Sequence, residues 1–532
     1  MALALVNGDL PNHPLWHLQS LEQALREAAD SSDSGIEFID ENGERSYLSY
    51  GDFYQKAISV GHVLIAHGIE RGDRVIIRVE EPAEFLFAFW GIVLVGAVAV
   101  PLSAYQPLPS GREASKGAID TLLAIEPKAI ICSRKDLGAL TDVVKAHADL
   151  LLPVINANDF LTLESSSEPL QSSTSKEDLA VIFPTSGSTG QPKLVPQTVD
   201  ALLSMAAGSV QMNRFDSSDV FLNWMPMDHV GSLAFLSILP VCAKSNQIHC
   251  NTAWVRQDIR RFLMLLTEYK VTAGWVPNHV FNQVEKLAIE PEWDLSHLYF
   301  LVNAGESISD NMERCAQLLS QCGLQRHAFR PAFGMSETCS GITWSQGIGA
   351  KVKQAVDLGS PIPGASIRVV SAAGEIKQQG EVGCLQVRGP SVTKGYLYHS
   401  SIGEGWFDTG DNAVIFNDKV YITDREGDAV DGLSVPAYQI EGEIDALHGI
   451  QAGMTAVCQV SGVLGVFYVV EANADLLGLS IEIEALLKGQ SSLPYQLFCC
   501  DQRDIPRTSI GKIQRKLLRR RLAEELDLEP MQ

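Results

Sequence analysis

One segment of the sequence combines residue types that could hold a phosphate. It follows the short apolar stretch Asp178–Pro184 and consists of Thr185, Ser186, Gly187, Ser188, Thr189, Gly190, Gln191, Pro192 and Lys193. Its glycines let backbone N–H groups approach an anion closely, its hydroxyls add donors, and Lys193 adds a positive charge. The spacing differs from that of P-loop NTPases, of dinucleotide-binding loops and of the hydrolase nucleophile elbow. The segment therefore predicts a phosphate-binding loop of another kind.

Further motifs follow this loop along the chain. They are Asn303–Glu306 (NAGE), Phe333–Thr338 (FGMSET), Trp406–Asp411 (WFDTGD), Asp424–Arg425 and Ile505–Arg515 (IPRTSIGKIQR). In this order they resemble the motifs of the adenylate-forming superfamily, which includes acyl-CoA synthetases, nonribosomal peptide synthetase adenylation domains and beetle luciferases. The runs Asn223–Gly231 and Pro331–Gly341 look most like starter-unit adenylation domains of hybrid polyketide/nonribosomal peptide synthases. The resemblance implies ATP- and Mg²⁺-dependent activation of a carboxylic acid as acyl-AMP, with release of pyrophosphate.

Forming an acyl-AMP brings a carboxylate to the α-phosphate of ATP, so positive charge must screen two anions. The resemblance implies that Lys512 bridges acid and phosphate, that Glu337 binds Mg²⁺, and that His229 gates the acyl pocket. Asp411 would accept hydrogen bonds from the ribose, and Arg425 would reach ribose or phosphate. The structural alternatives are a solvated lysine in a basic tail, a capping glutamate and a hydrogen-bonded core histidine. The residues assigned to the nucleotide are Thr185, Ser186, Gly187, Ser188, Thr189, Gly190, Lys193, Gly305, Glu306, Phe333, Gly334, Ser336, Asp411 and Arg425.

The acid itself is indicated by Val230. Amino-acid-activating relatives carry an Asp at this position, which pairs with the α-ammonium group of the substrate. An ammonium beside the apolar side chain of Val230 would lose its hydration without compensation. We therefore expect an acid without an α-amino group: an aryl, α-keto or short branched acid. The candidate pocket residues are His229, Val230, Phe235, Ile238, Asn278, His279, Ala304, Ala332, Met335 and Ile342.

The thiol that accepts the acyl group stays open at this stage. The expected acceptor is the phosphopantetheine of an acyl or peptidyl carrier protein, free CoA is the alternative, and a non-catalytic nucleotide-binding relative is a third reading. Gly427 stands where the superfamily usually has a Lys or Asp pivot, which favours adenylation over efficient thioester formation. No carrier serine motif follows Gln532, so we expect the carrier on another chain or on a part removed by truncation. The chain would act as a monomer or within a megasynthase.

Strand and helix patterns alternate through the first two thirds of the chain, which predicts parallel sheets with ligand sites at the carboxyl ends of the strands. Short strands and glycine-rich turns from Ser366 onward predict a small barrel or antiparallel sheet. The predicted fold is thus α/β, with two parallel-rich sheets and a small β-barrel-like subdomain at about 350–424. The expected domains are a large adenylation core, 1–424, and a small mobile α+β lid, 425–532, which carries Lys512.

The composition and net charge of the chain argue against some classes of binding partner. The chain has 532 residues, 46% of them hydrophobic, and a net charge of −23, so a polyanion such as nucleic acid or an anionic membrane is a poor partner. The apolar run 85–102 approaches the length of a membrane span, but its glycines and Pro101 favour a buried helix that ends near Gly96, followed by the strand Ala97–Val100. The ten cysteines show no metal-like spacing. A cytoplasmic protein with reduced thiols is expected.

Overall fold

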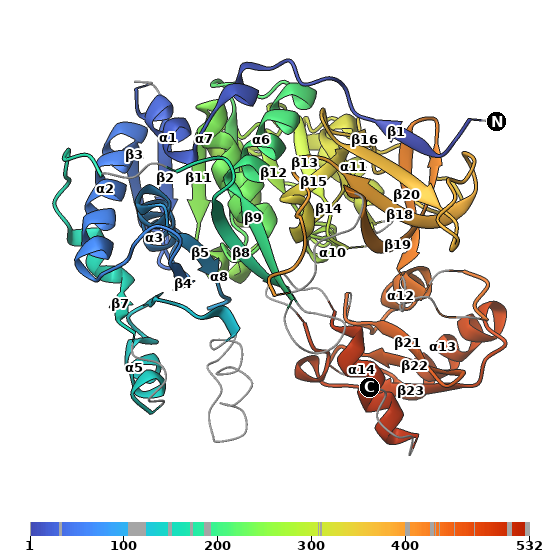
Figure 1. Ribbon diagram of the computed structural model, residues 1–532. Coiled ribbons are helices and arrows are strands. Elements are labelled where there is room, and N and C mark those ends of the chain that lie inside the picture. Colours follow the sequence, from blue (N-terminus) through green and yellow to red (C-terminus); the bar gives the residue numbers. More distant parts are fainter. Residues whose placement is uncertain are drawn as a thin grey trace.

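The computed structural model describes residues 2–30, 34–104, 124–146, 152–170, 174–185, 193–306, 308, 311–398, 405–425, 430, 432–435, 437–451, 453–472, 474–507 and 513–526. In these residues the strands form sheets of six, nine, five and three members. Figure 1 shows that the three larger sheets make up the upper body of the molecule, with the three-stranded sheet and its helices beneath it. The predicted α/β fold with parallel-rich sheets is confirmed.

The six-stranded sheet carries the predicted phosphate-binding loop. Its neighbours are parallel except for the last pair, β8 and β9, which form an antiparallel hairpin in which Thr185 lies opposite Lys193. The hairpin therefore holds the two ends of the loop side by side. In spatial order the strands are β7 (Val154–Asn156), β6 (Ala129–Cys132), β4 (Arg74–Arg78), β5 (Val98–Pro101), β8 (Leu179–Thr185) and β9 (Lys193–Thr198).

The nine-stranded sheet is parallel from β14 to β2 and antiparallel at both edges. The carboxyl ends of its parallel strands consequently lie along one edge, where loops can converge on a ligand. In spatial order the strands are β16 (Ser360–Pro361), β15 (Ser340–Trp344), β14 (Phe329–Met335), β13 (Phe300–Asn303), β12 (Ala273–Trp275), β10 (Val220–Asn223), β11 (Asn246–Cys250), β2 (Gly35–Ile39) and β3 (Arg45–Ser49).

Helix α3 (Pro82–Val95) is the apolar run that could have been mistaken for a membrane span. Pro82 occupies its first turn, and Gly96 ends it in the left-handed conformation at φ 80°. Every residue of α3 but Ala83 is buried, so the helix is apolar all round because protein surrounds it. The predicted buried helix followed by a strand is confirmed. No helix in the described part of the chain combines the length and the hydrophobicity needed to cross a membrane.

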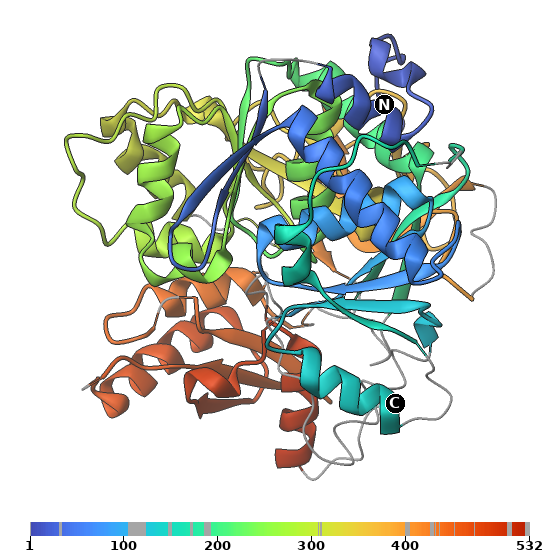
Figure 2. The same ribbon diagram turned by 90° about the vertical axis from the view of Figure 1, so that its left-hand side faces the viewer.

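The remaining helices of the N-terminal part pack around the two large sheets (Figures 1 and 2), except that α5 lies lower, below β7 in Figure 1. The α-helices are α1 (Leu21–Ala29), α2 (Tyr50–Ala66), α5 (Leu137–Ala146), α6 (Val199–Asn213), α7 (Leu239–Ala243), α8 (Thr252–Gln257), α9 (Arg260–Glu268), α10 (Asn278–Val284) and α11 (Asn311–Leu319). Short 3₁₀ turns are η1 (Pro14–His17), η2 (Ala157–Thr162), η4 (Ser320–Cys322), η5 (Arg326–Ala328) and η6 (Ser336–Thr338), whereas η3 (Gly231–Ile238) is a π-helix.

The five-stranded sheet is the predicted β-rich region, and its strands are all antiparallel. The sequence did not predict one of its strands: β1 comes from the N-terminal end of the described chain and pairs with β17. The strands in order are β1 (Leu5–Asn7), β17 (Ser366–Val370), β18 (Val382–Arg388), β19 (Phe407–Phe416) and β20 (Lys419–Arg425).

The C-terminal part has its own sheet and its own apolar clusters, drawn from residues 430 onward. The boundary proposed after residue 424 stays a prediction. Arg515, the last residue of the predicted C-terminal motif, pairs through its guanidinium with Glu441 at 2.6 Å, and both side chains are largely buried. The elements are α12 (Ala437–Asp445), β21 (Ala456–Val460), β22 (Val463–Tyr468), α13 (Leu476–Gln490), β23 (Tyr495–Cys499), η8 (Gln502–Asp504) and α14 (Arg515–Glu525).

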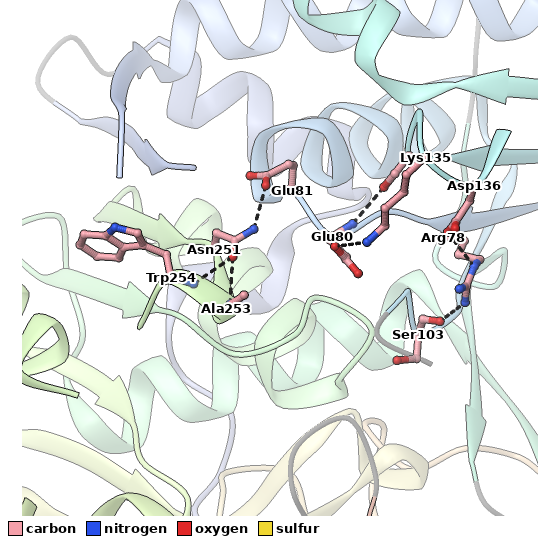
Figure 3. A network of polar contacts seen from close by, with 10 residues as sticks. Arg78, Glu80, Glu81, Ser103, Lys135, Asp136, Asn251, Ala253 and Trp254 are labelled. Atoms are coloured by element: carbon pink, nitrogen blue, oxygen red, sulfur yellow. Dashed lines mark hydrogen bonds and ion pairs between the residues drawn. The ribbon is translucent and has the colours of Figure 1, made fainter. Parts of the chain in front are cut away.

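Polar contacts join the two large sheets at the carboxyl ends of β4 and β11 (Figure 3). Asn251, which follows β11, donates a hydrogen bond of 2.8 Å to Glu81, which precedes α3. On the other side of the same junction, Arg78 pairs with Asp136 at 3.0 Å and donates to the Ser103 carbonyl. These contacts tie the end of β4 to β6 and β5, and the six-stranded sheet to the nine-stranded one.

Glu81 provides a pH-dependent test of this junction. Burial, with help from Glu41, Glu84 and Asp40, raises the pKa of Glu81 to about 7. The folded protein therefore binds more protons than the unfolded chain between pH ~4.5 and ~7, so this carboxyl lowers stability as pH rises through that window. Glu81→Gln removes the charge and keeps an acceptor for Asn251. We expect the Tm of this variant to exceed that of the wild type at pH 8, and the difference in Tm to shrink towards pH 5. Thermal unfolding at both pH values tests this. The same difference in Tm at pH 5 and pH 8 would contradict it.

Candidate active site

A small cavity lies at the carboxyl edge of the nine-stranded sheet. Three strand ends supply its walls, because the segments that follow β10, β12 and β13 meet there. The lining residues are Met225, His229, Trp275, Pro277, Ala304, Gly305 and Glu306. The predicted residues His229, Ala304, Gly305 and Glu306 are thus brought together in one cavity.

His229 stands at the entrance to the π-helix η3. Its Nδ1 accepts a hydrogen bond of 3.2 Å from the Gly231 amide, so a neutral ring carries its proton on Nε2. The ring meets the Trp275 indole edge to face at 5.9 Å. A Cβ on Gly231 would lie 2.7 Å from that indole, so only glycine allows the helix to approach Trp275 this closely. π-helical turns are rare and concentrate at functional sites, and η3 begins two residues after His229 of the cavity lining.

Glu306 links the cavity to helix α10 and to the C-terminal part of the chain. Its Oε1 accepts a hydrogen bond of 2.7 Å from the backbone amide of Asn278, the first residue of α10. The same carboxylate acts electrostatically on the largely buried guanidinium of Arg507. Burial, and then the nearby charges of Arg256 and Arg507, lower the pKa of His279 to about 4, so this ring is neutral at physiological pH.

Two glycines in the predicted nucleotide motifs are required by the backbone. Gly305 has φ +85°, and a Cβ there would meet nothing within 4 Å, so the backbone faces the open cavity. A Cβ on Gly334 would lie 2.0 Å from the Ser340 carbonyl oxygen, because β14 and β15 approach closely at a β-bulge. Cys339 and Ser340 both have positive φ, at 55° and 111°, which is a strained arrangement of the kind found at binding sites.

The base of the phosphate-loop hairpin contacts the predicted metal ligand through a tyrosine. The Lys193 ammonium lies 4.7 Å from the ring centroid of Tyr396. The Tyr396 hydroxyl donates a hydrogen bond of 2.8 Å to Oε1 of Glu337, whose residue is 5% exposed. Gln197 of β9 also donates to the Ser336 carbonyl at 2.6 Å, which fixes η6 against the hairpin.

Glu337 offers a hard carboxylate oxygen, the ligand type that Mg²⁺ prefers, beside the loop predicted to hold phosphates. A carboxylate has about four lone-pair positions, so the hydrogen bond from Tyr396 leaves room for a metal. The described residues contain no group of three or more potential metal ligands. Glu337 therefore fits a Mg²⁺ ion that takes its other ligands from phosphate and water, as such ions commonly do.

Other residues predicted for the acyl pocket do not line this cavity. Phe235 is fully buried and stacks within the core against Trp275 and Trp344, with ring centroids 6.1 and 4.8 Å away. Val230 is buried at the start of η3, and Ile342 is fully buried in β15. The rest are placed nearby on α10, β14 and η3, without forming part of the lining: Asn278, His279, Ala332, Met335 and Ile238.

The remaining predicted nucleotide residues are placed only in part. Thr185 at the end of β8, Phe333 in β14 and Ser336 at the start of η6 are half-buried. Asp411 lies directly opposite Arg425 in the β19–β20 ladder, so the backbone brings the two proposed ribose contacts together; the Arg425 side chain is outside the described residues. Also outside them are Ser186, Gly187, Ser188, Thr189, Gly190, Gly427 and Lys512.

Sequence reasoning missed Trp275 and Tyr396. Trp275 ends a three-residue strand and lines the cavity, yet as a single aromatic in an apolar run it has no distinguishing pattern. Tyr396 lies outside the motifs that carried the resemblance, and only the fold brings it between Lys193 and Glu337.

Comparison with known proteins shows the family to which the chain belongs. The AMP-binding enzyme family matches residues 25–397, which is most of the chain. The nonribosomal peptide synthetase btyA of Aspergillus terreus is 27% identical over 490 residues, 85% of this chain and 52% of the relative. The chain thus spans about half the length of the curated relatives it matches.

Two solved structures are similar over nearly the whole chain. The A-PCP structure of McyG, complexed with phenylalanyl-adenylate, has a TM-score of 0.89 and 31% identity, covering 98% of this chain and 85% of that one. A keto acid-selecting NRPS module with adenylation, ketoreductase and pseudo Asub domains has a TM-score of 0.88 and 26% identity, covering 98% and 47%.

The chain belongs to the AMP-binding enzyme family, and its fold and motifs are those of an adenylate-forming ligase. Within that family it is similar to the adenylation domains of nonribosomal peptide synthetases, including keto acid-selecting ones.

Proposed function

We propose that this protein activates a carboxylic acid without an α-amino group, as acyl-AMP, and passes the acyl group to a phosphopantetheine thiol. The observation that carries the choice of acid is the lining of the cavity. Of the described lining residues, Glu306 alone has a carboxylate, and that carboxylate already accepts the α10 amide and faces Arg507. A substrate ammonium group would find no comparable counter-charge there, and burying it would be costly.

An α-keto acid is the first candidate among the acids considered. The solved keto acid-selecting module, similar over 98% of this chain, supports this choice. The Trp275 indole, 5% exposed and held between His229 and Phe235, closes one side of the cavity with an apolar surface. Such a wall suits a flat or branched apolar side chain and gives no partner to a charge.

The residues divide the work of adenylation as follows. Gly305 and the backbone around it leave space for the nucleotide base, while Asp411 and Arg425 would hold the ribose. Glu337 would hold Mg²⁺, which when bound neutralises phosphate charge and so lets the acid carboxylate approach. Lys193 would contact the phosphates beside it, and Lys512 would add its ammonium between the carboxylate and the α-phosphate.

A carrier-borne thiol is the preferred acceptor, because the McyG structure contains an adenylation domain with a PCP and the curated relatives are peptide synthetases. Free CoA is the alternative acceptor. A thioester assay with the acyl-AMP and either a phosphopantetheinylated carrier or CoA separates them. Transfer to CoA at a rate equal to or above that to the carrier would overturn the preference.

The choice of acid is tested by acid-dependent ATP–pyrophosphate exchange. We expect α-keto or aryl acids to drive exchange and free α-amino acids to give at least tenfold less. Val230 directly follows His229 of the cavity lining, and Val230→Asp would place a carboxylate beside it as a counter-charge for an ammonium group. This substitution should therefore reverse the order. The expected tenfold difference between the two classes of acid corresponds to ~1.4 kcal/mol. Burying the ammonium group of an amino acid without a counter-charge costs more than that.

Val230→Asn is the matched control, since asparagine has the size and polarity of aspartate but no charge. It should weaken exchange with keto acids without creating exchange with amino acids. Wild-type exchange driven best by a free α-amino acid would show that the proposed acid class is wrong.

A further inference from the structure

Residues 393–397 form a strap between the phosphate-loop hairpin and the predicted metal ligand. The Thr393 amide donates to the Glu337 carbonyl at 2.7 Å, and its hydroxyl donates to the Pro196 carbonyl at 2.9 Å. At the other end, the Leu397 amide donates to the Leu194 carbonyl at 2.9 Å. The strap is thus anchored on η6 and on β9 at the same time, and Tyr396 lies between its anchors.

The ring and the hydroxyl of Tyr396 contact two groups of opposite charge, the Lys193 ammonium and the Glu337 carboxylate. The negative face of its ring receives the Lys193 ammonium, with Nζ 4.7 Å from the ring centroid. Its hydroxyl donates to Oε1 of Glu337 at 2.8 Å, a hydrogen bond to a nearly buried carboxylate. The ring is steadied by an edge contact with Phe407 at 6.4 Å.

Without this tyrosine, the two charges would be free to approach and form an ion pair with each other. Such a pair would satisfy both groups and leave less of either for an anionic nucleotide or a cation. The phenol side chain of Tyr396 makes a weaker contact with each of the two charged groups. The ammonium of Lys193 therefore keeps donors for other partners, and the carboxylate of Glu337 keeps acceptor positions.

We propose that Tyr396 is a positioning residue that keeps Lys193 and Glu337 apart and aimed at the same ligand, the phosphates and the Mg²⁺ of a bound nucleotide. This inference rests on the proposed adenylation function. Two parts of this side chain have separate roles in the proposal. The hydroxyl orients Glu337, the proposed metal ligand, and the ring holds the ammonium of Lys193, which would contact the phosphates. Those two roles can be removed separately.

Tyr396→Phe removes the hydroxyl and keeps the ring. We expect the Mg²⁺ concentration that half-saturates pyrophosphate exchange to rise about tenfold, the effect of losing one hydrogen bond to a charged group. Calorimetric titration with ATP in the absence of acid gives the readout that does not depend on turnover. In this titration, Mg²⁺ should increase the ATP affinity of Tyr396→Phe less than it increases that of the wild type. Without Mg²⁺, in EDTA, the ATP affinities of the two proteins should agree within about twofold.

Tyr396→Leu removes the hydroxyl and the π face but keeps an apolar side chain. It should show the same Mg²⁺ defect and, in addition, an ATP affinity in EDTA about fivefold weaker, because the ammonium loses its support. If this variant does not fold, the phenylalanine variant still decides the matter.

Tyr398 is a matched control two positions along the chain. Its hydroxyl donates to Glu126 at 2.8 Å, and the Arg74 guanidinium lies 5.4 Å from its ring centroid, so it repeats both contacts outside the site. Tyr398→Phe should leave both affinities and the Mg²⁺ requirement unchanged.

A Tyr396→Phe protein with a wild-type Mg²⁺ requirement would overturn the inference, as would an equal loss of ATP affinity with and without Mg²⁺, which indicates general disruption. Failure of the proposed function looks different, since the wild type itself would then give no exchange with any acid.

Discussion

Replacing Lys512 with alanine is expected to reduce acid-dependent ATP–pyrophosphate exchange by about 10²–10³-fold while ATP binding persists. The reason is that the proposed ammonium contact forms fully only as the carboxylate attacks the α-phosphate, so its loss raises the barrier and leaves the ground state nearly unchanged. Arg507, close before Lys512 in the chain, already acts on Glu306 in the cavity wall.

Exchange kinetics together with ATP titration measure this effect. Arg520→Ala is the control, because Arg520 is an exposed cation of the same basic tail, on α14. It should behave as wild type. Near-normal exchange in Lys512→Ala, or an equal loss in both variants, would remove Lys512 from the reaction and leave it as a solvated residue of the tail.

Glu337→Gln is expected to lower exchange by about 10²-fold and to raise the Mg²⁺ requirement at the same time. Glutamine keeps the shape of the side chain and an acceptor for Tyr396, so the strap and η6 should stay in place. What is lost is the negative charge, and a neutral amide is a much weaker partner for a hard dication.

The measurement is exchange over a range of Mg²⁺ concentrations, with thermal unfolding to show that the fold is kept. Glu126→Gln is the matched control, since Glu126 also accepts a tyrosine hydroxyl, at 2.8 Å, but outside the cavity. A Glu337→Gln enzyme with an unchanged Mg²⁺ requirement would mean that this carboxylate acts as a cap for η6 and not as a metal ligand.

Local chain chemistry was enough to predict much of the fold. The apolar run 85–102 predicted a buried helix followed by a strand, because Gly96 stops the helix and β-branched residues come after it. The glycine-rich turns beyond Ser366 likewise predicted antiparallel strands, which the five-stranded sheet confirms. The gathering of Ala304, Gly305 and Glu306 at the end of β13 follows from the same rules for parallel sheets.

What the sequence could not show depends on contacts between distant residues. Tyr396 acquires its role only because the strap crosses β9 and η6, and no local pattern encodes that crossing. Phe235 was expected in the acyl pocket, but it packs in the core against Trp275, and Trp275 is the residue that lines the cavity. A helical pattern also does not reveal that the turns of η3 are wider than those of an α-helix.

Strand β1 has a practical consequence for anyone who trims this protein. The family match begins at residue 25, yet Leu5–Asn7 pair with Ser366–Arg368 of β17. A recombinant form cut at the family boundary would expose that stretch of β17 as a bare sheet edge, which is a template for intermolecular pairing and aggregation. Expression trials should therefore retain the first residues and judge solubility before activity.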